Sequence, residues 1–304
     1  MRIFYSDPIA LPLPEGHRFP ADKYTLLRQN MIQAGLTLSN ELILSKPASV
    51  DQLLLAHHPD YIEKVLNGKL TEKETRRIGF PWSLQLVERS RRSVGGTIAA
   101  CQAALEDGLS ANLGGGTHHA YPDHGEGYCV FNDVAIAARA MQAESSARRI
   151  VILDCDVHQG NGTAAIFAGD STVFTFSIHG EKNFPFHKEQ SDIDIALPDG
   201  SGDEIYLEAL HPGIQSAIDL AYADLAVYIA GADPFAGDRL GRLALTKAGL
   251  DERDRQVLNA CQRAGLPVAI VLGGGYARKI EDIIDIHLQT IRLAVESTHH
   301  DHIQ

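Results

Sequence analysis

Three side chains able to bind a metal ion or to move a proton lie close together in the segment VILDCDVHQGNGTA, which covers Val151–Ala164. Asp154, Asp156 and His158 alternate with other residues after an apolar run, and side chains two apart in an extended chain point the same way. Two neighbouring carboxylates repel each other, and burying them is costly without a cation or a hydrogen-bond donor. The spacing therefore indicates a divalent metal site, although a capping Asp in a solvated turn would give the same pattern.

A third ligand is available at the end of another apolar run, where Asp233 stands in the segment GADP. We expect Asp156, His158 and Asp233 to bind one divalent ion. Three protein ligands with a position left open for water are typical of a catalytic zinc site. Histidine and carboxylate ligands also suit Fe2+, Co2+ and Mn2+, so Zn2+ is the expected ion and these are the alternatives.

Two adjacent histidines, His118 and His119, follow three glycines in GGGTHHA. They could be core residues, or one ligand and one bystander, but a polar loop of this kind favours acid–base chemistry. Asp154 is left over once the metal takes Asp156 and can accept a hydrogen bond from one histidine, whereas Asn161 can do so for the other. A carboxylate partner raises an imidazole pKa more than a neutral amide does. The histidine paired with Asn161 would stay neutral near pH 7 and could take a proton from water at the metal.

Aromatic residues beside glycines complete the candidate chemistry. Tyr276 follows three glycines in LGGGY, where its phenol could donate a hydrogen bond to a developing oxyanion or simply pack at a strand end. Gly127 and Tyr128 in GEGYCVFND, with Phe184 further along, could form a slender aromatic channel. From the residues alone, ordinary core packing is the better interpretation of these last three.

The elements that must position these residues alternate between strands and helices. The expected strands are short apolar runs at Arg2–Tyr5, Ile150–Leu153, Val173–Ile178, Leu225–Ala230 and Pro267–Leu272. The expected helices are Ser83–Leu105, interrupted by Gly95-Gly96, and then Asp133–Gln142, Ile205–Ala221 and Ile280–Val295. This alternation predicts βαβ units and a parallel sheet. Polar residues follow several of the strands, and ligands of such sheets bind beyond the carboxyl ends of the strands.

The composition is that of an ordinary globular protein, with 304 residues of which 44% are hydrophobic and 22% charged. No repeat or linker divides the chain, so residues 1–304 are expected to form one domain. The four cysteines form no CxxC pair, which argues against a zinc ribbon or a disulfide framework and favours a reducing, cytoplasmic setting. No apolar run suits a membrane span or a signal peptide. The net charge of −12 argues against nucleic acid and favours cationic substrates.

Together the motifs resemble the zinc-dependent histone deacetylase family, which shares its fold with the arginases. The segments GGGTHHA, GYCVFND, DCDVHQGNG, GADPFAGDRLGR and LGGGY occur in the order seen in that family. The resemblance extends through HRFP, HHPDYI and GFPWS and so covers nearly the whole chain. HQGNG and LPEGHRFPADKY are most similar to the class IV branch and its bacterial relatives. The implied fold is a single α/β domain, with a central parallel sheet flanked by helices on both faces.

The resemblance implies a role for each catalytic position. The positions that match the family's metal ligands are Asp156, His158 and Asp233. His118 and His119 match the tandem histidines, with His119 implied as the general base. Asp154 matches the carboxylate partner of His118. Asn161 matches the partner of His119, where many members have Asp, and this departure is typical of class IV. Tyr276 matches the transition-state tyrosine and implies a competent deacylase.

The resemblance also implies a substrate channel and a second ion. Gly127 and Tyr128 match channel residues, where Phe is the commoner choice, and Phe184 is implied on the opposite wall. Arg18 is implied to line an inner pocket that receives the released acid. Family members also bind a monovalent cation, K+, near Asp154, Asp156 and His158, using backbone carbonyls that include those near Ser177.

The combined reading is an amide hydrolase that removes an acyl group from the side chain of acyl-lysine. An acetylpolyamine deacetylase is the nearest alternative, and the absence of a long insertion favours lysine. A dimanganese ureohydrolase would need a second Asp two residues after Asp233, where Phe235 stands. A non-catalytic acyl-lysine-binding protein would not need His119 or Tyr276. A NAD-binding module lacks its G-x-G-x-x-G motif between strand and helix.

Overall fold

The computed structural model describes residues 1–38 and 41–300. The strands are β1 (Arg2–Tyr5), β2 (Leu42–Leu44), β3 (Leu109–Asn112), β4 (Ile150–Asp154), β5 (Val173–Gly180), β6 (Ile193–Leu197), β7 (Leu225–Ile229) and β8 (Val268–Val271). The helices are α1 (Lys23–Gln33), α2 (Val50–Leu53), α3 (Pro59–Leu66), α4 (Glu72–Ile78), α5 (Leu84–Asp107), α6 (Asp133–Ala143), α7 (Asn161–Ile166), α8 (Asp203–Ala221), α9 (Lys247–Arg263) and α10 (Ile280–His300). Every strand pairing among these residues is parallel, in the order β2-β1-β3-β8-β7-β4-β5-β6.

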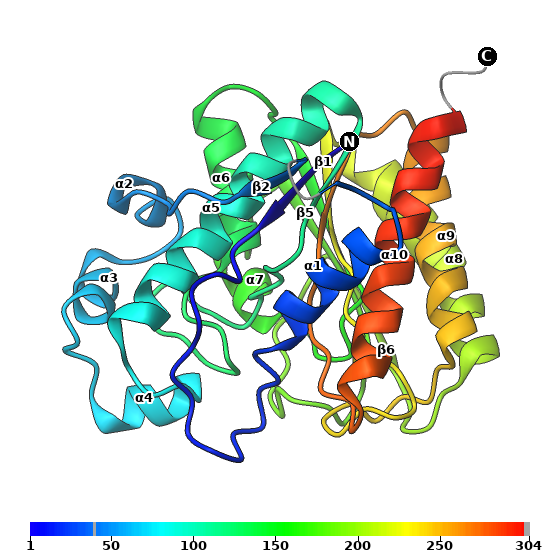
Figure 1. Ribbon diagram of the computed structural model, residues 1–304. Helices are drawn as coiled ribbons and strands as arrows, with labels where there is room; N and C mark the ends of the chain where they lie inside the picture. Colours follow the sequence, from blue (N-terminus) through cyan, green and yellow to red (C-terminus); the bar gives the residue numbers. More distant parts are fainter. Residues whose placement is uncertain (39–40, 301–304) are drawn as a thin grey trace.

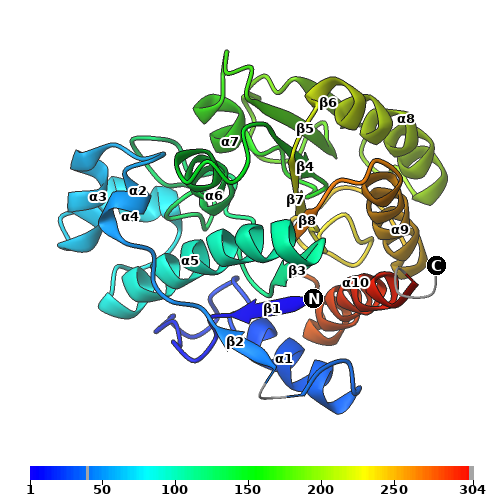
Figure 2. The same cartoon turned by 90° about the horizontal axis from the view of Figure 1, so that it is seen from above.

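Helices cover both faces of this sheet, as Figure 2 shows from above. On one face α5 packs against β1, β3 and β8 and also against α6. On the other face α8 packs against α9, and α10 packs against both α9 and α1. Each face has its own cluster of buried apolar side chains, and the central strands β4 and β7 are buried along their whole length. This arrangement confirms the predicted fold class and explains the uninterrupted apolar runs.

The five predicted strands are all present, with ends that differ by at most two residues. β2, β3 and β6 were not predicted. β3 reads LSAN and is fully buried, so its polar side chains conceal it from an apolar pattern. The Ser110 hydroxyl donates to the Ala100 carbonyl of α5 at 2.5 Å, and the Asn112 amide donates to the Ser93 carbonyl at 3.0 Å. These bonds to α5 satisfy the polar groups of the strand and so offset the cost of burying them.

The predicted interruption at Gly95-Gly96 is wrong, because α5 runs unbroken through both glycines. A Cβ on Gly95 would lie 1.9 Å from the Lys46 carbonyl oxygen, and one on Gly96 would lie 2.6 Å from the Ser45 hydroxyl. The glycines therefore allow the chain after β2 to lie directly against the helix. Although α5 is 24 residues long, neither it nor any other described helix has the length and apolar character needed to cross a membrane.

Because every strand pairing is parallel, the carboxyl ends of the strands all lie at one edge of the sheet. This edge faces downward in Figure 1. β4 lies beside β7, with Asp154 in register with Ile229, and β7 lies beside β8, with Ile229 in register with Val271. The loops that follow β4, β7 and β8 are therefore neighbours. These loops carry DCDVH, GADP and GGGY, so the sheet order brings the predicted site together.

Candidate active site

The two ligands after β4 are placed by a turn, not by the strand. β4 ends at Asp154, and Asp156 and His158 lie in the bend beyond it, so the predicted alternation along an extended chain does not hold for them. The Asp156 N–H donates to Asp154 Oδ1 at 3.1 Å, and the His158 N–H donates to Asp156 Oδ1 at 3.0 Å. Each carboxylate thus accepts the N–H two residues on, as Asp commonly does in turns.

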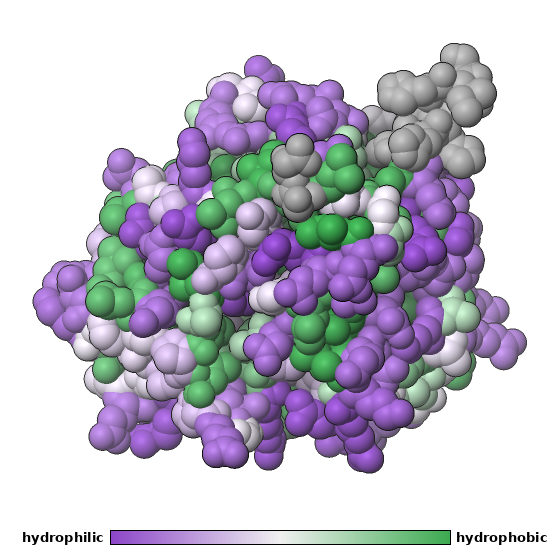
Figure 3. All heavy atoms as spheres, in the orientation of Figure 1, coloured by the Kyte–Doolittle hydropathy of each residue, from purple (hydrophilic) through white to green (hydrophobic). Residues whose placement is uncertain are grey.

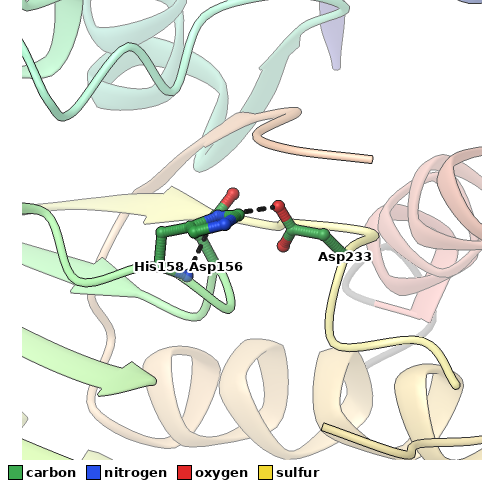
Figure 4. A group of neighbouring side chains, drawn as sticks. All are labelled: Asp156, His158 and Asp233. Atoms are coloured by element: carbon green, nitrogen blue, oxygen red, sulfur yellow. Dashed lines mark hydrogen bonds and ion pairs between the residues drawn. The ribbon is translucent and has the colours of Figure 1, made fainter. Parts of the chain in front are cut away.

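The side chains of Asp156, His158 and Asp233 converge, as Figure 4 shows, with one ligand atom of each within 4.8 Å of the others. His158 Nδ1 lies 3.0 Å from Asp156 Oδ1 and 3.2 Å from Asp233 Oδ2. Asp233 Oδ2 is buried and accepts no hydrogen bond from any described residue. Burial, together with the charge of Asp156, raises the pKa of Asp233 to about 7. Two buried carboxylates facing one imidazole nitrogen fit a divalent cation, which would satisfy all three donors.

Backbone N–H groups hold the remaining carboxylate oxygens. The Gly274 N–H donates to Asp156 Oδ2 at 2.6 Å, and the Val157 N–H donates to Asp233 Oδ1 at 2.9 Å. A Cβ on Gly274 would lie 1.8 Å from Asp233 Oδ2 and 2.7 Å from Asp156 Oδ2. The glycine run after β8 is therefore needed so that bare backbone can reach both carboxylates.

The tandem histidines lie beside this group with different partners. His118 Nδ1 donates to Asp154 Oδ2 at 2.6 Å, whereas His119 Nδ1 lies 2.6 Å from Asn161 Oδ1. Burial alone would lower the pKa of His118, but Asp154 and Asp156 raise it to about 9. Burial lowers the pKa of His119 well below its ordinary value, and the neighbouring His118 adds to this effect. The two imidazoles therefore differ in the way that an acid and a base should.

Glu126, which sequence reasoning missed, determines how Asn161 faces His119. The Asn161 amide nitrogen donates to Glu126 Oε1 at 2.6 Å, so its oxygen must face the histidine. His119 Nδ1 consequently donates, and the lone pair is on Nε2, which faces the pocket. Arg77 donates to the other oxygen of Glu126 at 2.9 Å. The resulting chain of hydrogen bonds fixes the tautomer that a general base needs.

The histidine loop is held in place by Asn132 and Asp133 of the GYCVFND segment. The Asp133 carboxylate accepts from the Thr117 N–H at 2.7 Å and from the Gly116 N–H at 3.2 Å. The Asn132 amide donates to the Ala120 carbonyl at 3.1 Å and also caps α6 by accepting from a backbone N–H. Both residues are fully buried. The motif therefore ties the loop that carries the histidines to the first turn of a rigid helix.

Tyr276 is held by the second half of the GADPFAGDRLGR segment. Its N–H donates to Asp238 Oδ2 at 2.6 Å, and its carbonyl accepts from Arg239 Nε at 2.8 Å. Burial raises the pKa of its phenol well above the ordinary value, with Asp233 and Asp156 adding to the effect. The phenol is therefore a hydrogen-bond donor at neutral pH. It lines the same pocket as His119 and His158.

Gly127, Tyr128 and Phe184 all line this pocket, whose volume is about 780 Å3. The Phe184 ring lies against the His119 ring, with 4.9 Å between centroids. A Cβ on Gly127 would lie 2.7 Å from His119 Cδ2 and 3.2 Å from Phe184 Cε1. Only glycine leaves room between these two rings. Tyr128 packs 5.8 Å from the Tyr276 ring on the side that also holds Phe80.

Arg18 does not lie where the resemblance implied. The rings of its neighbours His17 and Phe19 point inward against Phe80, at centroid distances of 5.8 and 4.9 Å, so the side chain between them points outward. Arg18 is exposed near the mouth of the pocket, beside Arg239. A small inner cavity of about 60 Å3 is lined instead by the buried Arg89, which sequence reasoning missed.

Lys23 is a further buried cation that sequence reasoning passed over, although it stands in the quoted segment LPEGHRFPADKY. Its Nζ lies 3.4 Å from the Gly275 carbonyl oxygen and 5.5 Å from the centroid of the Tyr276 ring. A cation over the face of an aromatic ring is attracted to it. Lys23 thus helps to position the loop that carries Tyr276.

The chain is similar to known proteins over most of its length. Residues 17–291 match the model of the histone deacetylase domain. An uncharacterised protein of Picosynechococcus sp. is 47% identical over 285 residues, which cover 94% of this chain and 95% of the relative. A histone deacetylase-like amidohydrolase of Pseudomonas aeruginosa is 30% identical over 284 residues, covering 88% of this chain and 74% of the relative. The crystal structure of a histone deacetylase homologue from Aquifex aeolicus has a TM-score of 0.83 at 22% identity, over 97% of this chain and 84% of that one.

The fold and the buried Asp–His–Asp group define an α/β protein with a group that could hold a metal ion beside paired histidines. The chain belongs to the histone deacetylase family, which confirms the resemblance seen in its motifs. Family membership makes it a deacetylase or amidohydrolase in the broad sense.

Proposed function

We propose that this protein is a zinc-dependent lysine deacylase, which removes an acetyl or longer acyl group from the side chain of acylated lysine. Asp156, His158 and Asp233 would hold the ion. A divalent cation bound there would polarise the amide carbonyl and lower the pKa of water. The donor set also suits Fe2+ and Co2+.

The chain's own residues supply the proton transfers and the oxyanion donor. His119 Nε2 accepts the proton of the attacking water, because its Nδ1 is committed to Asn161. The phenol of Tyr276 donates a hydrogen bond to the oxygen that becomes negative as the amide carbonyl is attacked. A histidine then returns a proton to the amine nitrogen as the carbon–nitrogen bond breaks. The nearby carboxylate of Asp154 keeps His118 suited to carrying positive charge.

One observation carries the proposal: a general base, an oxyanion donor and a metal ligand, His119, Tyr276 and His158, line the same pocket. Gly127 and Phe184 line the pocket beside His119, and a slender chain such as that of acyl-lysine would pass between them. A non-catalytic binding protein would not require the base and the donor to converge with a buried ligand set. This convergence favours an enzyme.

The test is hydrolysis of lysine peptides acylated with groups from acetyl to long fatty acyl, run beside acetylated polyamines. We expect hydrolysis of at least one acyl-lysine peptide, and its loss in His119→Ala. If every peptide resists hydrolysis while an acetylated polyamine is cleaved, the acetylpolyamine deacetylase is the correct alternative. If nothing is cleaved but acyl-lysine peptides bind, the protein is a binding module.

Four further proposals concern a second ion, the branch of the family, the extent of the domain and the setting of the protein. The resemblance alone supports a K+ ion near Asp154 and Ser177 and membership of the class IV branch. The domain match over residues 17–291 supports a single catalytic domain spanning residues 1–304. The four cysteines are buried free thiols, which supports a reducing, cytoplasmic setting.

A further inference from the structure

The mouth of the pocket has the opposite charge from the molecule as a whole. The cationic side chains that line it are Arg76, Arg77, Lys182, Arg239 and Arg242, and we refer to these five residues as the basic rim. Glu126 is the carboxylate among the described lining residues. The chain as a whole carries a net charge of −12. A concentration of positive charge at the mouth of the candidate site calls for an explanation in terms of substrate.

Glu126 offsets one member of the basic rim, Arg77, and leaves the other four cations without a carboxylate from the described residues of the pocket lining. Its two oxygens are occupied by Arg77 at 2.9 Å and by the amide of Asn161 at 2.6 Å, and it is 8% exposed. The charge of Glu126 is therefore paired with Arg77 inside the protein, and its other oxygen orients the amide of Asn161 beside the general base. The remaining cations of the basic rim therefore face an incoming molecule without a negative charge from Glu126.

Arg239 and Lys182 have no carboxylate partner among the described residues. The Arg239 guanidinium donates to two carbonyls, those of Tyr276 at 2.8 Å and Arg18 at 3.0 Å, which fix its position but leave its charge uncompensated. Lys182 is exposed. An adjoining depression of about 300 Å3 is lined by Arg18, Arg239 and Leu240, so the positive surface continues outward from the mouth.

The ion pairs of the other two rim arginines are weak ones. Arg76 pairs with Glu72 at 3.3 Å, where the side chains are 74% and 89% exposed, and Arg242 pairs with Asp199 at 2.9 Å at the surface. Exposed pairs of this kind contribute little free energy. A substrate carboxylate can therefore join or replace either partner at small cost.

The basic rim stands on both sides of the channel. Arg77 at the end of α4 accepts a hydrogen bond through its carbonyl from the Gly127 N–H at 3.2 Å, so it lies above one wall. Lys182 is two residues from Phe184, the other wall. α4 and the loops after β5 and β7 lie along the lower edge in Figure 1, where Figure 3 shows mainly hydrophilic residues. A chain laid across the mouth would meet positive charge before and after the acylated side chain.

We infer that the substrate is an acyl-lysine flanked on both sides by aspartate or glutamate, within an extended segment of an acidic protein. This inference rests on the proposed function. The acyl group must reach the buried site, so the groups at the rim are those next to the lysine in sequence. A small anionic amide would meet only one side of the mouth, and acetylated polyamines and lysine-rich tails would be repelled.

The test compares three acetyl-lysine peptides that differ only in the two residues on each side of the lysine: acidic, neutral or basic. We expect kcat/KM to be about tenfold higher for the acidic than for the neutral peptide, and lower still for the basic one. Raising salt from about 0.05 M to about 0.5 M should reduce the difference, because exposed charges are screened. An acetylated amine that carries a single carboxylate, and acetylspermidine, complete the panel.

The variant Arg76→Gln/Lys182→Gln removes one cation from each side of the mouth and should reduce the acidic preference to about threefold or less. The matched control is Arg148→Gln/Arg263→Gln, which removes two exposed cations from the opposite edge of the sheet. That control should keep the full preference. A similar loss in the control would mean that only net charge matters.

The outcomes separate the two proposals. Hydrolysis of the neutral peptide without preference for acidic flanks, or with preference for basic flanks, overturns the inference and leaves the proposed function intact. A preference for the small carboxylated amine over all peptides also overturns it, in favour of a small anionic substrate. If no acetyl-lysine peptide is hydrolysed, the proposed function itself fails.

Discussion

At the scale of single residues, the chemistry depends on which nitrogen of His119 carries the proton. Nδ1 must donate because the amide of Asn161 is turned by Glu126, so Nε2 is left to accept a proton. The neutral state of this imidazole follows from its burial among other histidines. A carboxylate thus orients the base without touching it, and the base avoids the rise in pKa that direct contact would cause.

Replacing Glu126 with Ala frees the amide of Asn161 to turn and should lower kcat about tenfold, because only part of the general-base contribution is lost. The loss should appear mainly in kcat, because Glu126 acts on the base through Asn161. Glu126→Gln retains an oxygen that can accept from the amide and should restore most of the rate. Steady-state kinetics of the two variants check this. Equal losses in both would show that Glu126 acts in another way.

Removing the hydroxyl in Tyr276→Phe should reduce kcat by about 10²–10³-fold, the usual effect of losing one oxyanion donor. The backbone of Tyr276 is held by Asp238 and Arg239, so the fold and the metal content should be unchanged. Kinetics and metal analysis of the same preparation provide the check. A turnover close to that of the wild type would remove the phenol from the mechanism.

At the scale of secondary-structure elements, α9 connects the two loops that carry the proposed metal ligands. Arg253 is fully buried and donates to the carbonyls of Cys155 at 3.3 Å and Gly231 at 2.5 Å, next to the ligand loops of β4 and β7. Asp254 balances its charge at 2.8 Å and also accepts from Tyr228. One side chain on a helix thereby sets the spacing between Asp156 and Asp233.

Arg253→Met leaves Asp254 buried and unpaired, so the free energy of unfolding should fall by about 3–5 kcal/mol. Arg253→Lys keeps the charge but cannot reach both carbonyls, so its stability loss should be smaller while its metal affinity still falls. Urea unfolding and metal titration of both variants test this. Wild-type metal affinity in a folded Arg253→Lys variant would show that the clamp does not position the ligands.

His57 connects the segment before α3 to the loop that carries the tandem histidines His118 and His119. Its Nδ1 donates to the Tyr121 carbonyl and its Nε2 accepts from the Asn132 N–H, both at 2.9 Å, so the ring must be neutral. Burial lowers its pKa to about 4. The unfolded state therefore binds a proton first as pH falls. The stability supplied by the neutral ring is complete above about pH 6.5 and is lost between there and about pH 4.

Between pH 8 and pH 5 this group alone should remove about 2 kcal/mol from the free energy of unfolding. His57→Gln can still donate and accept but does not titrate, so its stability should depend less on pH by about that amount. Urea unfolding of both proteins at the two pH values measures the difference. Parallel pH dependences would show that His57 does not titrate as its surroundings indicate.

At the scale of the whole molecule, the net charge does not describe the charge at the mouth of the pocket. The value of −12 favours cationic ligands, but the basic rim is positive, and a ligand approaching the mouth is governed by the nearby charges within a Debye length. No composition can reveal this, because the rim residues come from α4 and from the loops after β5 and β7. Only folding brings these positive charges close together.

The sequence points to the candidate site because its expected ligands lie shortly after buried strands. Asp156 lies two residues after the end of β4, and Asp233 lies four residues after the end of β7. It missed residues whose partners are distant along the chain: Glu126 contacts a residue 35 positions away, and Arg253 one 98 positions away. β3 was missed because its side chains are polar yet buried. Arg18 does not reach the inner cavity because it is exposed, in a bend that covers Arg18 and Phe19.

The measurement that tests the central claim most directly is the hydrolysis rate of metal-stripped protein as Zn2+ is added back. Among the described residues, the side chains of Asp156, His158 and Asp233 form a group that could hold a metal ion. The stripped protein should be inactive, and its hydrolysis rate should rise with added Zn2+ to a plateau at one ion per chain. The variant Asp233→Ala should bind the ion weakly and stay inactive. Undiminished hydrolysis by the stripped protein, or a plateau only at two ions per chain, would contradict the account.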